Sequence, residues 1–259
     1  MRGPLVNRGV RPRRLAVLLC LTFCLAAGSV TGCAAQTPTS IAPPTSIAAS
    51  APSPTPRPTL TPQASVGIAA TATGTSVDVY DTPEGTVTVT MTNPGPSGAP
   101  LSYLVEGEKP GWLKVQLPVR PNGSTGWIKS DSVTESNLTY RVQVSTEQNT
   151  LTVYQNDTVL NTYPVATGTG GTPTPHGSFY LLELLAPTNS GYGPYAFGLS
   201  AFSDALTSFG GGPGQIGLHG TDDASSIGHA VSHGCIRMNN TDISTLAALL
   251  PLGTPITIQ

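Results

Sequence analysis

The chain has 259 residues, a formal net charge of −2 and only 10% charged side chains, together with 29 glycines and 25 prolines. Five of its twelve basic residues and none of its fourteen acidic residues fall within positions 1–33, so the remainder carries seven basic against fourteen acidic side chains. Proteins that bind nucleic acids need a basic surface. The composition therefore excludes a nucleic-acid partner.

The first 33 residues are typical of an export signal. Arginines are followed by the apolar run Leu15–Ala27 and then by small residues. This order predicts a secretory signal, because an apolar run of about 13 residues is shorter than the roughly 20 that cross a bilayer. Val30–Cys33 also resembles a bacterial lipobox, which implies a lipid on Cys33 that anchors the protein to the outer face of the cytoplasmic membrane, facing the cell wall. An ordinary signal peptide, cleaved near Ala34 or Ala35 so that Cys33 is lost, is the alternative.

Residues 34–65 consist almost wholly of Ala, Ser, Thr and Pro, with eight prolines and the single charge of Arg57. Such a stretch buries too little apolar surface to offset the entropy of ordering it, so a disordered linker is predicted. As a coil it would span about 30 Å, which suits a tether. The residues that follow are enough for two small domains.

The first of these domains, residues 66–136, is predicted to be all-β, because short runs of alternating polarity are separated by turn residues. The predicted strands are Ser76–Tyr80, Thr86–Met91, Trp112–Leu117 and Gly126–Lys129. The segments Pro110–Val115 and Thr125–Val133 resemble bacterial SH3-like domains, which often accompany cell-wall enzymes. For Trp112 and Trp127, packing in the core or at the barrel rim is favoured over ligand binding.

The second domain, residues 138–259, begins with further β-type runs and ends with one helix. The predicted strands are Arg141–Ser145, Thr150–Tyr154, Thr158–Val165, Ser178–Leu182 and Thr254–Ile258. Gln155–Asp157 is a plausible hairpin turn. The helix begins at a cap, Asn240 or Thr241, carries an apolar stripe from Ile243 to Leu250, and ends before Pro251.

Between these elements, residues 191–220 hold nine glycines. They contain no Gly-Lys-Ser/Thr element, which argues against a phosphate-binding loop. A mobile flap over a binding site and an irregular surface loop both fit this composition.

Cys235 is the only cysteine beyond position 33. Exported proteins normally pair their thiols, so a lone thiol beside His233 and Arg237 indicates a nucleophile, with a buried structural cysteine or an intermolecular disulfide as alternatives. A thiol is activated by a neighbouring imidazole or cation. Gly234 would let a substrate approach the backbone, where N–H groups of residues 233–235 could stabilise an oxyanion.

Three histidines, His219, His229 and His233, precede Cys235 within sixteen residues and could complete a tetrahedral zinc site with it. The chain lacks both a Cys-x-x-Cys pair and a His-Glu-x-x-His motif. Neither a metal nor another cofactor is therefore expected.

Three blocks, Ile216–Thr221, Ser226–Gly228 and Ser232–Met238, together resemble the catalytic signature of the L,D-transpeptidases. Upstream, Thr174–Phe179 is similar to that family's Thr-Pro-x-Gly-x-Phe segment. The resemblance covers about residues 140–258. It implies a mostly β fold, in which a small SH3-like barrel precedes an L,D-transpeptidase-type β-sandwich with one C-terminal helix.

The resemblance also implies roles for individual residues. Cys235 is the nucleophile, His219 its general base, and the carbonyl of Gly220 orients the imidazole. His233 shapes the pocket, and Arg237 recognises a carboxylate or stabilises the site.

Several neighbouring residues are expected to assist substrate binding. Ser232 and Gly234 form the turn before the cysteine, with Ser232 holding it by a hydrogen bond. Tyr192 and Tyr195 are candidates for lining the flap. His229 lies outside the family pattern and is expected to be a solvated loop residue.

The implied reaction joins two peptidoglycan stem peptides. Cys235 attacks the carbonyl of a third stem residue, terminal D-alanine leaves, and an amine of another stem resolves the thioester into a cross-link. Carbapenem β-lactams are the implied inhibitors. Water as acceptor would give an L,D-carboxypeptidase, and a protein acceptor would give attachment to the wall. A wall-binding lipoprotein with a vestigial catalytic domain is the third hypothesis.

Overall fold

Two large β-sheets, one two-stranded sheet and one α-helix form the regular structure of the part of the chain that the computed structural model describes, residues 65–259. The predicted signal peptide, the lipidation at Cys33 and nearly all of the predicted linker lie outside the described residues. The described residues, 65–259, belong to one structural unit. In it, we call Gly67–Leu138 the first β unit and Tyr140–Ile258 the second β unit. Among the described residues, no helix combines the length and the apolar character of a membrane span.

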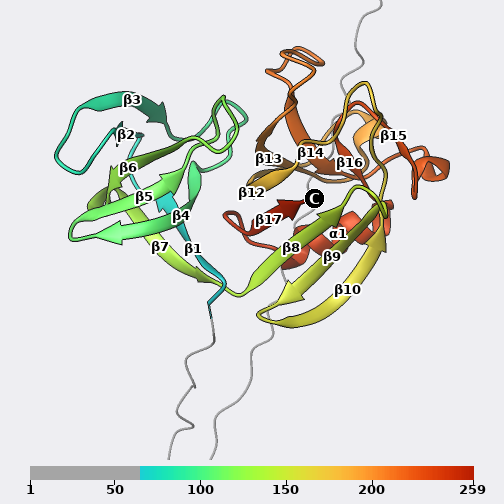
Figure 1. The fold of residues 1–259 in the computed structure, drawn as a ribbon, viewed down its shortest axis with the longest axis horizontal. Helices are drawn as coiled ribbons and strands as arrows, with labels where there is room; N and C mark the ends of the chain where they lie inside the picture. Colours follow the sequence, from blue (N-terminus) through green and yellow to red (C-terminus); the bar gives the residue numbers. More distant parts are fainter. Residues whose placement is uncertain (1–64) are drawn as a thin grey trace, which may run out of the picture. The chain divides into compact units, whose positions relative to one another are not determined.

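The first β unit is a seven-stranded sheet in the order β3-β2-β6-β5-β4-β1-β7 (Figure 1). Its strands are β1 (Gly67–Ala72), β2 (Ser76–Tyr80), β3 (Val87–Thr92), β4 (Ser102–Lys109), β5 (Trp112–Gln116), β6 (Thr125–Lys129) and β7 (Val133–Leu138), with a 3₁₀ turn at Ser130–Ser132. Alternate residues face its core, as Val77 and Val79 do on β2. This alternation is what made four of these strands predictable to within one residue.

Trp112 is 8% exposed and packs edge-on against Tyr80, with ring centroids 4.9 Å apart. Trp127 is half-buried beneath the ammonium group of Lys109. The packing role expected for the tryptophans is confirmed for Trp112. The similarity of this unit to SH3-like domains remains a prediction.

The second β unit is built on an eight-stranded sheet in the order β10-β9-β8-β17-β12-β13-β14-β16, with a separate parallel pair, β11 and β15. Its strands are β8 (Tyr140–Ser145), β9 (Thr150–Gln155), β10 (Thr158–Pro164), β11 (Thr167–Gly168), β12 (Gly177–Leu185), β13 (Ala196–Phe202), β14 (Gln215–His219), β15 (Ala230–Ser232), β16 (Ile236–Arg237) and β17 (Pro255–Ile258), and 3₁₀ turns lie at Ser190–Tyr192 and Ala224–Ser226. The predicted hairpin turn joins β9 to β10 and places Asn156 at φ +53°. The mostly β fold class with one helix is confirmed for the described residues.

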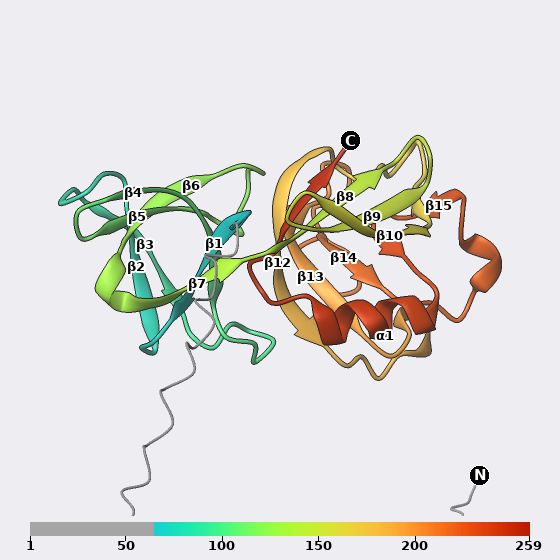
Figure 2. The same ribbon diagram turned by 90° about the horizontal axis from the view of Figure 1, so that it is seen from below.

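The helix α1 (Asn240–Leu249) packs against the second sheet (Figure 2). Ile243, Leu246 and Leu250 are buried in the same apolar core as the strands. The prediction that the Asn240 or Thr241 side chain caps this helix was wrong: the N-cap residue is Asn239, and no side chain caps the helix there. Asn240 instead accepts a hydrogen bond from the backbone of Thr221, 2.9 Å away.

The glycine-rich stretch 191–220 is not one flap or loop, because it contains two strands of the second sheet, β13 and β14. All seven residues of β13 are buried. Glycine lowers β propensity, which concealed these strands in the sequence. Only residues 203–214 remain as a loop between them.

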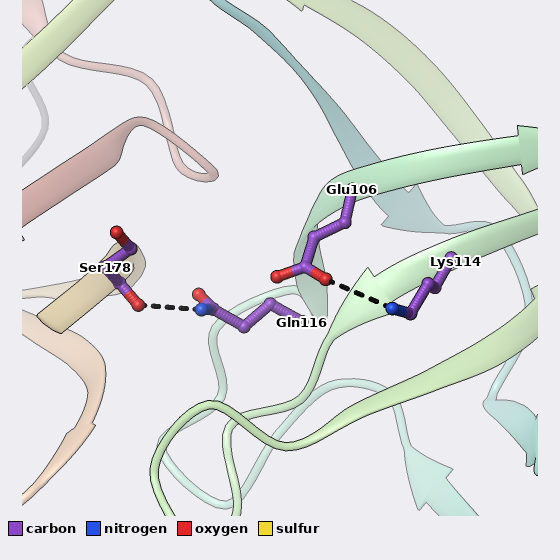
Figure 3. A network of polar contacts seen from close by, with 4 residues as sticks. All are labelled: Glu106, Lys114, Gln116 and Ser178. Carbon is purple, nitrogen blue, oxygen red and sulfur yellow. Dashed lines mark hydrogen bonds and ion pairs between the residues drawn. The ribbon is translucent and has the colours of Figure 1, made fainter.

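Polar contacts join the two β units. Gln116 on β5 donates a hydrogen bond from Nε2 to the carbonyl oxygen of Ser178, 2.7 Å away (Figure 3). The ion pair between Lys114 and Glu106 in the same figure spans 3.8 Å between partly exposed side chains, so it contributes little to stability.

Arg120 of the first β unit holds both ends of the loop 203–214. Its guanidinium donates hydrogen bonds to the carbonyl oxygens of Ser203 (2.8 Å), Leu206 (3.1 Å) and Pro213 (3.0 Å). The fork geometry of arginine allows one side chain to serve several acceptors at once. The loop conformation thus depends on a residue outside the sheet that carries it.

We expect Arg120→Ala to loosen the loop and to leave the sheet intact. Hydrogen exchange followed by mass spectrometry should show faster exchange for residues 203–214, while the melting temperature changes little because Arg120 is exposed. Arg141→Ala, which removes a guanidinium from β8, is the matched control. Unchanged exchange in the Arg120 variant would show that the loop is held by other contacts.

Candidate active site

The turn that carries Cys235 connects β15 to β16 and is closed by Ser232. The Ser232 hydroxyl donates to the carbonyl oxygen of Cys235 (2.6 Å) and accepts from the N–H of Gly234 (3.1 Å). Gly234 has φ +117°, a backbone conformation that favours glycine. The expected turn-holding hydrogen bond of Ser232 is therefore confirmed.

The thiol of Cys235 is half-buried and accepts a hydrogen bond from the N–H of Gly217, with 3.4 Å between nitrogen and sulfur. Burial raises the pKa of this thiol, and the Gly217 hydrogen bond and the positive charge of Arg237 only partly oppose that effect. The resting group is accordingly a neutral thiol at pH 7. It needs a base to become a nucleophile.

His219, the last residue of β14, is only 3% exposed. Its Nδ1 lies 2.5 Å from the carbonyl oxygen of Gly220, and since a carbonyl only accepts, Nδ1 carries the proton. Nε2 is then free to accept a proton. The pKa of His219 is lowered to about 4, mainly by burial and in part by the charge of Arg237, while the Gly220 hydrogen bond acts in the opposite direction. The imidazole is thus a neutral base at physiological pH.

Gly217 separates the thiol from the imidazole. A Cβ atom on this glycine would lie 3.4 Å from Cδ2 of His219 and 3.7 Å from Sγ of Cys235. The bare backbone therefore leaves open a space that both functional groups border. Sequence reasoning assigned no role to Gly217, although its spacing two residues before His219 on a strand places both on one face.

Arg237 lies beside His219, because β16 pairs with β14 in parallel and sets these two residues in register. It lines a small cavity of about 190 Å³ together with His219, His233 and Cys235. Within residues 65–259 the single ion pair is that of Lys114 with Glu106, so Arg237 forms no ion pair, although its charge helps to lower the pKa of Asp223. Its guanidinium is available to an anionic group.

Two aromatic rings wall the site. Tyr192 packs on His219 with ring centroids 4.7 Å apart, and Phe209 of the loop 203–214 stacks on His233 at 5.2 Å. Both rings also line a larger cavity of about 430 Å³ that reaches Cys235. Phe209 was missed in the sequence, where it is one aromatic residue in a polar and glycine-rich loop.

Tyr195 does not join Tyr192 at the site. Its side chain is 37% exposed and lines neither of the two cavities at Cys235. Its carbonyl oxygen instead accepts a hydrogen bond from the N–H of Gly220. The tyrosine thus affects the site only through the backbone that carries the His219 acceptor.

Asn240 supports that backbone from the other side. Its Oδ1 accepts from the N–H of Thr221 and fills the space where a Cβ atom on Gly220 or on Gly193 would lie. Both glycines are required for this close approach. The position of Asn240 at the start of α1 made it look like a cap, so its role at the site was missed.

The remaining expectations concern backbone donors, His229 and metals. The Gly234 N–H is occupied by Ser232, which leaves those of His233 and Cys235 without an acceptor among the described residues. His229 is exposed and lines neither cavity at Cys235. No group of three His, Cys, Asp or Glu side chains in the described range could hold a metal ion.

Known proteins include several chains that this one resembles. The protein YkuD of Bacillus subtilis (strain 168) is 39% identical over 122 residues, which span 47% of this chain and 67% of YkuD. Among solved structures, an L,D-transpeptidase from Mycobacterium smegmatis matches with 18% identity and a TM-score of 0.40, over 60% of this chain and 80% of that one. L,D-transpeptidase 3 from Mycobacterium tuberculosis, in complex with a faropenem-derived adduct, matches with 16% identity and a TM-score of 0.42, over 54% and 76% of the two chains.

The match to a family model covers residues 139–258, the second β unit with its helix. That model describes the YkuD L,D-transpeptidase catalytic domain. The stretch contains Cys235, His219, Gly217 and Arg237. Together with the 39% identity to YkuD over 67% of that protein, this match shows that the chain belongs to the YkuD family of L,D-transpeptidase catalytic domains.

Proposed function

We propose that this protein cross-links peptidoglycan stem peptides through their third residues, with a thioester on Cys235 as the intermediate. The observation that carries the proposal is the space above Gly217, which Cys235 Sγ and the neutral imidazole of His219 both border. A thiol next to a neutral base, inside a cavity, suits acyl transfer. Family membership supports the same chemistry.

In the first half-reaction His219 Nε2 takes the proton of the thiol while Sγ attacks the carbonyl carbon of the third stem residue. The Gly220 carbonyl holds the Nδ1 proton and stabilises the imidazolium that forms. The unoccupied N–H groups of His233 and Cys235 are the candidate donors for the oxyanion. The imidazolium then returns its proton to the departing D-alanine amine, and the thioester remains.

In the second half-reaction an amine of another stem attacks the thioester. His219 accepts a proton from that amine and returns one to the leaving sulfur, which restores the thiol. Arg237, without a carboxylate partner in the described structure, is placed to bind a carboxylate of the substrate. Carbapenem β-lactams carry both a reactive carbonyl and a carboxylate, so we include them as inhibitors.

The direct test is to incubate the purified chain with tetrapeptide muropeptides and to analyse the products by mass spectrometry. We expect a cross-linked dimer that has lost one D-alanine, and no product with Cys235→Ala. Tripeptide alone would instead support the L,D-carboxypeptidase. Equal activity of the Cys235→Ala variant would refute the assignment of the nucleophile.

The pKa values predict the pH dependence of Cys235 acylation. Since the pKa of His219 is lowered to about 4, the base stays unprotonated as pH falls through 6.5, and the rate should decrease only near pH 4. The measurement is the second-order rate of carbapenem acylation between pH 4 and pH 9 by stopped-flow absorbance. In His219→Asn the rate should instead follow the thiolate fraction and rise about tenfold per pH unit, because the raised pKa of Cys235 keeps the thiol protonated. An acid limb centred near pH 6.5 in the wild type would contradict the buried, neutral His219.

Gly217→Ala tests the shared space above the strand. The new Cβ atom fits at ordinary van der Waals distance, so the variant should fold with a nearly unchanged melting temperature. It occupies the approach to the thiol, and we expect kcat/KM for D-alanine release to fall at least about 100-fold. Gly107→Ala, at a strand position of the first β unit with room for a Cβ atom, is the matched control. Retained activity in Gly217→Ala would show that the substrate reaches Cys235 from another side.

A further inference from the structure

A half-buried carboxylate lies on the same sheet surface as the thiol. Glu183 on β12 is in register with Gly198 on β13, and Gly198 is in register with Gly217 on β14. Register partners in antiparallel strands project to the same face. The carboxylate of Glu183 bends over β13 into the space where a Cβ atom on Gly198 would lie.

The two glycines fix the distance between carboxylate and thiol. Cβ positions on register partners are about 5 Å apart, and Cys235 Sγ lies 3.7 Å from that position on Gly217. The carboxylate is therefore within about 11 Å of the sulfur, across a strip of sheet formed by Gly198 and Gly217, with the side-chain amide of Gln215 beside Gly198. A substrate bound at Cys235 can lie along this strip.

The carboxylate has no cationic partner in the described part of the chain, where the single ion pair joins Lys114 and Glu106. Its Oε2 accepts a hydrogen bond from Ser97 of the first β unit, and no described group donates to Oε1. Glu183 faces a cavity of about 500 Å³ whose other walls are mostly apolar. Pro213 and Gln215 line both this cavity and the one that reaches Cys235, so the two spaces adjoin.

A carboxylate with an open oxygen in an apolar recess is suited to a primary ammonium group on an aliphatic chain. We propose that Glu183 binds the side-chain ammonium of a diamino acid in the third position of the stem peptide whose carbonyl reacts with Cys235. This inference rests on the proposed function and adds to it the residue that recognises the substrate's side chain. It makes Glu183 a specificity-determining residue and Ser97 the group that orients it.

The length of such a side chain is compatible with this upper bound on the distance. In an extended lysine-type side chain the amine lies about 7 Å from the carbonyl carbon of the same residue. Attack brings that carbon to about 3 Å from the sulfur. The amine then reaches about 10 Å from Sγ, which is within the bound that the two glycines set for Glu183.

The test measures equilibrium binding, so that it does not depend on turnover. Full-length Cys235→Ala is titrated by calorimetry with a tetrapeptide stem that has lysine at the third position, and with the same peptide acetylated on the side-chain amine. We expect acetylation to weaken binding about tenfold, as loss of a charge-assisted hydrogen bond would. In Cys235→Ala/Glu183→Gln the two peptides should bind alike.

Glu147→Gln in the same background is the matched control. Glu147 is exposed, and it lines neither the cavity that Glu183 faces nor the cavity that reaches Cys235. It should keep the tenfold preference. Ser97→Ala should reduce the preference severalfold without abolishing it, which keeps the proposal testable even if Glu183→Gln does not fold. An equal effect of acetylation with and without Glu183, or equal binding of both peptides by Cys235→Ala, would overturn the inference.

The same two peptides separate this inference from the proposed function when the wild-type chain is assayed for D-alanine release. Release from both peptides at equal kcat/KM supports the reaction and refutes the role of Glu183. A preference in binding without any release supports the ammonium site and refutes the reaction.

Discussion

The bare surface of two adjacent strands is the constraint on which the rest of the site depends. Gly198 and Gly217 are register partners, and the absence of their side chains opens a strip between the carboxylate of Glu183 and the thiol of Cys235. Glycine weakens a strand, so this opening costs stability. The buried residues of β13 and the core beneath the sheet offset that cost. A site built on strands also holds its groups more rigidly than one built on loops.

Burial sets the protonation states of the two reacting groups. It disfavours the charged form of each, so it raises the pKa of the Cys235 thiol and lowers that of the His219 imidazole. The thiol and the imidazole are thus both neutral. In the proposed reaction, the thiol proton therefore moves to His219 as the sulfur attacks the carbonyl, rather than before that attack. The carbonyl of Gly220 stabilises the charge that His219 acquires during that transfer. This carbonyl is itself held in place, since Asn240 and Tyr195 bind the backbone on both sides of it.

Local patterns explain which parts could be predicted from the sequence. Alternating polarity identified β2 and β9, and the motif around Cys235 identified its neighbours His219 and Arg237 together with the turn of Ser232. Strands rich in glycine and alanine, such as β13, lack that alternation and were read as loop. Gly217, Asn240 and Glu183 were missed for a different reason. Their roles depend on contacts between segments distant in the sequence, such as Glu183 with Gly198 or Asn240 with Thr221, which no local pattern reports.

The first β unit contributes to the site through contacts rather than through reacting groups. Arg120 fixes the loop that carries Phe209, and Phe209 stacks on His233 at the mouth of the cavity. Ser97 binds the Glu183 carboxylate at the far end of the strip. These contacts lie on opposite sides of the same cavity wall, which Pro213 and Gln215 form. A shift of the first unit would therefore alter the access to Cys235 and the surroundings of Glu183 together.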